Sequence, residues 1–191
     1  MIIRLTVGSL AALLIAAAPA RVPLQAPKHP AATTAACDAP VWGDMVPAFD
    51  SRVQDYLALR HRLESDAASS SALAGRIRAA RAGARPGALF TPALSLEIKK
   101  SLLRVLDADT LKVIMDDNPG EVPSQVNDDY RAGSPLSTMP PNILAALPRL
   151  PEGVEYRFVE RHLILLDTMS RVIVDRIPYA IGYSATAENC R

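Results

Sequence analysis

The sequence VEYRFVERHLILLDTMSRVIVDRI, residues 154–177, carries the pattern that decides the fold. Val154–Val159 alternates between apolar and charged side chains, His162–Leu166 is almost continuously apolar, and Arg171–Ile177 carries another apolar run. Alternation predicts a strand with one buried face, whereas an unbroken aliphatic run predicts a strand that is covered on both faces. Short polar segments between such runs are typical of a β-meander. We therefore predict three antiparallel strands in this stretch.

Upstream of the meander, apolar residues recur at intervals of three and four, which is typical of amphipathic helices. This spacing predicts helices over Pro47–Ser65 and Ala72–Ala84. A third helix is predicted to open at Thr91-Pro92, because a threonine hydroxyl can cap a helix and proline suits its first position. We predict a short helix or strand at Leu111–Met115 and a short helix at Asn142–Leu147.

Helices followed by strands predict the α+β class, with a helical N-terminal half, about residues 47–115, packed on a C-terminal three-stranded antiparallel β-meander, about residues 154–177. Residues 116–138 are polar and contain Pro and Gly, so we predict a long irregular loop there. Residues 41–191 are predicted to form a single domain. A sheet of only three strands has two exposed edges, which helices or a partner strand must cover.

The N-terminal residues have the features of a secretory signal peptide. Met1–Arg4 supplies one positive charge, Leu5–Ala18 is apolar, and Ala18-Pro19-Ala20 places small residues where a signal peptidase cleaves. We predict a signal peptide over residues 1–20, cleaved after Ala20, and a periplasmic or secreted protein without a transmembrane segment after cleavage. Retention of the apolar run as a membrane anchor is the alternative. Residues 21–40, rich in Pro, Ala and Thr, are predicted to be a flexible linker.

Charge argues against a nucleic-acid partner. The chain has a net charge of +1, and removal of residues 1–20 removes Arg4 but no acidic residue, which brings the net charge to about zero. A domain that binds nucleic acid needs an excess of basic residues.

Two cysteines, Cys37 and Cys190, lie near the ends of the chain. In an oxidising compartment an even number of cysteines indicates a disulfide, and a loop of this length would stabilise the fold by roughly 5 kcal/mol. Two free thiols are the alternative. Lipidation of Cys37 is disfavoured, because this residue lies far beyond the apolar run.

The sequence contains no G-x-S-x-G, S-x-x-K, H-E-x-x-H or C-x-x-C motif, no glycine-rich phosphate loop and no EF-hand loop. Asp167 and Asp175 could serve acid–base chemistry, but aspartate at turns and strand ends more often binds backbone amides. His29, His61 and His162 show no spacing that predicts a metal site. We therefore assign no catalytic, cofactor-binding or metal-binding residue, and a protein that is not an enzyme is favoured.

Arg78, Arg81 and Arg85 are spaced by three and four residues, so they would share one face of the predicted second helix. Such a face could bind an anionic partner, for example phospholipid headgroups or an acidic protein. The alternative is an ordinary solvated face, with some arginines paired to Asp128 and Asp129.

Several segments resemble an uncharacterised family of bacterial exported, periplasmic proteins: IRAAR (77–81), FTP (90–92), LPRLPE (147–152), EYRFVERHLILLD (155–167) and VIVD (172–175). The resemblance spans about residues 49–177 and implies an exported bacterial protein, but it brings no activity and no site residues. In that family the first turn of the meander usually carries glycine, where this chain has Glu160.

Together, these features predict an exported, non-enzymatic protein that binds another envelope component or an anionic surface. Binding would use an edge of the sheet or the arginine-bearing helix. The alternatives are an unrecognised envelope hydrolase and a structural or stress protein that associates with the membrane surface.

Overall fold

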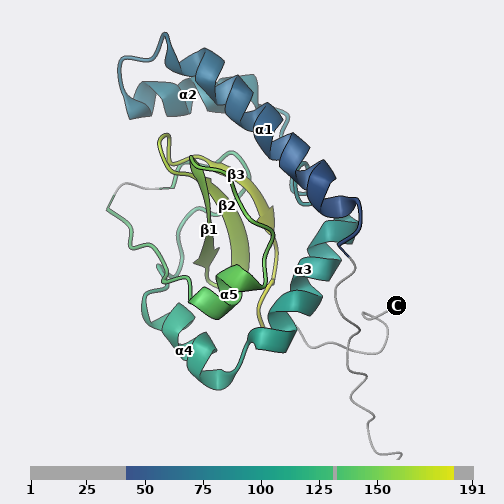
Figure 1. Ribbon diagram of the computed structural model, residues 1–191. Helices are drawn as coiled ribbons and strands as arrows, with labels where there is room; N and C mark the ends of the chain where they lie inside the picture. The colour runs from purple at the N-terminus through teal and green to yellow at the C-terminus, as the bar shows by residue number, and fades with distance from the viewer. Residues whose placement is uncertain (1–41, 131–132, 183–191) are drawn as a thin grey trace, which may run out of the picture. The chain divides into compact units, whose positions relative to one another are not determined.

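The computed structural model describes residues 42–130 and 133–182, over which five helices precede three strands (Figure 1). This order confirms the predicted α+β class, with a helical N-terminal half and a C-terminal three-stranded antiparallel sheet. The predicted signal peptide, the linker over residues 21–40, Cys37 and Cys190 lie outside the described residues.

The helices are α1 (Met45–Glu64), α2 (Ser70–Ala80), α3 (Pro92–Val105), α4 (Ala108–Asp116) and α5 (Pro141–Ala145). The predicted start of α3 is confirmed, since the Thr91 hydroxyl accepts a hydrogen bond from the Leu94 amide at 3.4 Å and Pro92 is the first helical residue. The predicted end of the second helix is wrong, because α2 stops four residues before Ala84. None of the helices in the described part of the chain combines the length and the apolar character that crossing a membrane requires.

The sheet has the strand order β1 (Val154–Val159), β2 (His162–Asp167), β3 (Ile173–Ile177), and both pairs of neighbours are antiparallel. The meander is therefore confirmed, with β3 starting two residues later than predicted. Arg171, with a φ of 61°, turns the chain just before it, and Val172 forms an isolated bridge to Asp129.

The central strand is covered on both faces, as its continuous apolar run predicted, and all six of its residues are buried. One face packs against residues from all five helices: Phe49, Val53, Ile77, Leu94, Ile98, Leu102, Ile114 and Ile143. The opposite face packs against the long irregular loop. There, Ile164 and Leu166 of β2 contact Tyr130, with Val122 and Leu136 beside them.

The first turn of the meander uses Glu160 in a left-handed conformation, with a φ of 51°. The two tight turns that best fit hairpins, types I′ and II′, both need a positive φ at the first of their two central residues. Asn118 holds this conformation from the irregular loop, because its side chain accepts from the Glu160 amide at 2.7 Å and donates to the Glu160 carbonyl at 2.9 Å. A side chain 42 residues away therefore supports a conformation that glycine usually adopts.

Candidate functional site

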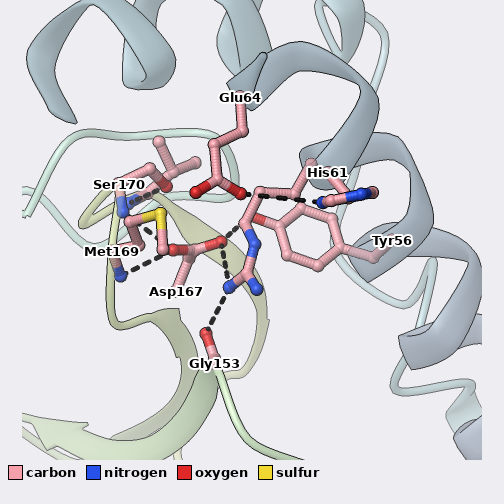
Figure 2. A network of polar contacts seen from close by, with 9 residues as sticks. Tyr56, His61, Glu64, Gly153, Asp167, Met169 and Ser170 are labelled. Carbon is pink, nitrogen blue, oxygen red and sulfur yellow. Dashed lines mark hydrogen bonds and ion pairs between the residues drawn. The ribbon is translucent and has the colours of Figure 1, made fainter. Parts of the chain in front are cut away.

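Asp167 ends strand β2, where its side chain is fully buried. Its Oδ1 accepts hydrogen bonds from the backbone amides of Met169 and Ser170, both at 2.8 Å. Its Oδ2 accepts from the Tyr56 hydroxyl at 2.7 Å and lies 3.5 Å from the Arg60 guanidinium (Figure 2). The carboxylate thus fixes the turn after β2 and ties that turn to α1.

The partners of Asp167 on α1 are themselves held in place. Arg60 also donates to the carbonyl of Gly153 at 3.0 Å, which joins α1 to the start of β1 (Figure 2). Burial, together with the nearby Asp167 carboxylate, raises the pKa of Tyr56 above its ordinary value. Tyr56 therefore stays protonated and acts as a hydrogen-bond donor in a closed structural network.

Asp175 lies on β3 and is also fully buried. Its oxygens accept hydrogen bonds from the amides of Gly87 at 3.0 Å, Leu89 at 2.6 Å, Phe90 at 2.8 Å and Arg176 at 2.8 Å. The side chain therefore anchors the loop between α2 and α3 to the sheet. Four backbone donors on one carboxylate leave it no free position for a substrate proton.

These contacts distinguish between two roles for the aspartates, acid–base chemistry and the binding of backbone amides. Both carboxylates are inaccessible to solvent, and both bind backbone amides, as aspartates near turns commonly do. A general acid or base must instead lie within hydrogen-bonding reach of a substrate. The geometry therefore weighs against acid–base chemistry at Asp167 and Asp175.

The three arginines predicted to share a helical face are in different surroundings. Arg78 is exposed near the end of α2, while Arg85 lies exposed in the following loop, beyond the helix. Arg81 is partly buried, and its Nη2 donates to the Val174 carbonyl at 2.7 Å. Its guanidinium lies 5.2 Å from the centre of the Tyr56 ring, and burial lowers the pKa of Arg81. An anionic partner at this face stays a prediction, which now depends on Arg78 and Arg85.

The histidines of the described chain lie apart in the fold. His61 is exposed on α1, whereas His162 is buried at the start of β2. His29 lies outside the described residues. Within residues 42–130 and 133–182, no group of three or more His, Cys, Asp or Glu side chains could hold a metal ion.

The outer edge of β3 is covered by the chain itself. The amides of Asn127 and Tyr130 donate to the carbonyls of Ile173 and Arg171, both at 2.8 Å. The Ile173 amide donates to the Asp128 carbonyl at 2.9 Å, and Arg81 occupies the Val174 carbonyl. This edge therefore offers little room for another strand.

Along the outer edge of β1, a described residue accepts a hydrogen bond only near the end of the strand. The Phe158 amide donates to the Ser137 hydroxyl at 2.8 Å, so it points away from β2. Amides point alternately along a strand, so those of Val154 and Tyr156 share this direction. Within the part of the chain that the structure describes, neither of these two amides has a hydrogen-bond acceptor.

A surface hollow of about 470 Å³ lies beside this edge. Its lining comes from α5, from the segment between α5 and β1, and from β1, and it comprises Leu144, Pro148, Arg149, Leu150, Val154, Glu155, Tyr156 and Arg157. The lining is mostly apolar, and Leu144 is 47% exposed. Arg157 pairs with Glu155 at 2.7 Å, whereas Arg149 is exposed and makes no ion pair with a described residue. We call the unpartnered main-chain amides of Val154 and Tyr156, residues that are 5% and 3% exposed, together with this hollow, the β1 edge site.

Comparison with known protein families, with curated proteins and with solved structures finds no match. The sequence predicts that helices or a partner strand cover the edges of the sheet, but an irregular segment, residues 127–130, covers the β3 edge. Residues 127–130 and Ser137 are distant in sequence from the strands that they contact.

Proposed function

We propose that the protein is an exported, non-enzymatic binding protein of the bacterial envelope, which binds an extended segment of another envelope component at the β1 edge site. The observation that carries this proposal is the pair of unpartnered amides on Val154 and Tyr156 beside a mostly apolar hollow. An extended peptide can add to such an edge through main-chain hydrogen bonds, while adjacent pockets select its side chains.

The geometry limits what could bind. Along the outer edge of β1, Val154 and Tyr156 have the only amides without an acceptor among the described residues, because Phe158 already donates to Ser137. The added strand would therefore be short. Apolar side chains of the partner would enter the hollow near Leu144, and the unpaired Arg149 favours an acidic residue beside them. A short added strand would bury well below about 1,200 Å² of surface, and interfaces of that size are typical of weak, transient complexes.

The test places a photo-crosslinking amino acid at Leu144 and, as a matched control, at Val113. Both positions are exposed apolar residues on helices, at 47% and 43%, but only Leu144 lines the hollow. Crosslinking would be carried out in the envelope of the native host. We expect one defined product from position 144 and none from position 113.

The segment that is crosslinked would then be synthesised as a peptide and titrated into the purified protein by NMR. We expect the amide signals of Val154 and Tyr156 to shift on binding, and Arg149→Glu to weaken it. Equal labelling from both positions, or a peptide that leaves these two amides unchanged, would contradict the proposal.

A further inference from the structure

Residues 178–182 form a strap after β3 that returns to the first turn of the meander. The Tyr179 amide donates to Nδ1 of His162 at 2.9 Å, and the Ile181 amide donates to the Arg161 carbonyl at 3.2 Å. The Tyr179 ring meets the imidazole edge-on, with the ring centres 4.9 Å apart. Ala180 and Ile181 are buried in the core. Polar contacts with the turn and apolar burial therefore both hold the strap.

The hydrogen bond from Tyr179 fixes the protonation of His162. An amide donor requires a lone pair on Nδ1, so the ring is neutral and carries its proton on Nε2. Nε2 lies 3.7 Å from a carboxylate oxygen of Glu160. A second proton could enter only at Nδ1, where it would face the Tyr179 N–H. Protonation would thus remove the hydrogen bond and place two donors against each other.

We propose that His162 is a pH-sensitive latch, whose protonation releases the strap over residues 178–182 and exposes the apolar surface under Ile181. This inference is independent of the β1 edge site. It rests on a buried imidazole whose one accepting nitrogen holds a backbone amide of the strap.

The charged groups around His162 set the pH at which the latch opens. Burial lowers the pKa of His162, and Arg176 on β3 and Lys99 on α3 lower it further, while Glu160 raises it. The folded protein therefore binds the proton less readily than the unfolded chain. The latch contributes its full stability above a pH of about 6.5 and loses it as the pH falls below that value.

The test follows the purified protein by NMR from pH 7.5 to pH 4.5. We expect the His162 ring signal and the Tyr179 and Ile181 amide signals to change together, with one midpoint below about 6.5. Binding of a hydrophobic dye should rise over the same range. The Leu89 amide, which Asp175 holds, should stay constant and so distinguish strap release from unfolding.

Two variants and a control decide the interpretation. His162→Asn places an oxygen where Nδ1 lies, so it should keep the strap bound and abolish the transition. Glu160→Gln removes the neighbouring negative charge and should move the midpoint down by about a few tenths of a pH unit at low salt. His61→Gln, at an exposed histidine, should leave the transition unchanged.

Titration of His162 without a change at Ile181 would overturn the proposal, as would a transition that persists in His162→Asn. If His162→Asn does not fold, an unchanged midpoint in Glu160→Gln would overturn it instead.

Discussion

Glu160 is a residue with a side chain that adopts a left-handed backbone conformation. Its φ of 51° is uncommon for a residue with a side chain, and Asn118 contacts only its backbone groups. Glu160→Gly should keep both of these hydrogen bonds and relieve the strain. We expect a gain in the free energy of unfolding of about 0.5–1 kcal/mol, measured by urea denaturation.

The matched control for Glu160→Gly is Glu152→Gly. Glu152 is also an exposed glutamate before a strand, but its φ is not positive. Glycine there should leave stability unchanged or lower it, because it only adds freedom to the unfolded chain. Equal effects of the two substitutions would show that Glu160 is not strained.

Two buried tyrosines allow a comparison of hydrogen bonds to charged and neutral acceptors. Tyr56 donates to the Asp167 carboxylate at 2.7 Å, and Tyr156 donates to the Pro148 carbonyl at 3.0 Å. We expect Tyr56→Phe to lower the free energy of unfolding by about 1.5–3 kcal/mol and Tyr156→Phe by about 0.5–1.5 kcal/mol. Denaturant unfolding measures both, and a larger loss in Tyr156→Phe would refute the role given to Asp167.

At the scale of elements, Asp175 joins the loop between α2 and α3 to the sheet. Asp175→Asn keeps one accepting oxygen but turns an amide group toward backbone donors, so at least one of them loses its partner. We expect a loss of about 2–4 kcal/mol in the free energy of unfolding. Hydrogen exchange should show reduced protection at Leu89 and Phe90 first.

Asp109→Asn is the matched control for Asp175→Asn. Asp109 is exposed on α4 and makes no hydrogen bond to that loop, so its substitution should change stability by less than about 0.5 kcal/mol. Similar losses in the two variants would mean that the contribution of Asp175 is not specific.

Helix α2 shows why the spacing of apolar residues can mispredict where a helix ends. The spacing of Ile77, Ala80 and Ala84 continues past Ala80, yet the helix stops there. The Asn127 side chain donates to the carbonyls of Arg78 and Arg81, at 2.9 and 3.2 Å, and Arg81 turns toward Val174. These contacts satisfy carbonyls that a longer helix would otherwise bond internally.

At the scale of the whole molecule, the predicted disulfide between Cys37 and Cys190 would close nearly all of the chain that follows the predicted cleavage site. Intact mass under non-reducing conditions should correspond to a chain that begins at Arg21 and lacks two hydrogens. Reduction should lower the free energy of unfolding by up to roughly 5 kcal/mol. Free thiols that react with an alkylating reagent before reduction would rule the disulfide out.

The sequence by itself determined the class of the fold and the order and approximate position of the three strands, although β3 begins two residues later than predicted. The spacing of apolar residues is a local pattern, and the alternation in β1 and the continuous run in β2 each match the burial of the strand. The start of α3 was equally local, because Thr91 and Pro92 act on the turn that they begin.

Only the tertiary structure decided which polar residues are structural and which edge of the sheet keeps amides without an acceptor in the described chain. Asp175 acquires its role from amides more than 80 residues away, Asp167 from Tyr56 on α1, and Arg81 from a carbonyl on β3. Residues 127–130 bond along the β3 edge, whereas on the β1 edge only Phe158 has an acceptor among the described residues, namely Ser137. Such contacts depend on where distant segments meet in space, and residue spacing along the chain does not encode that.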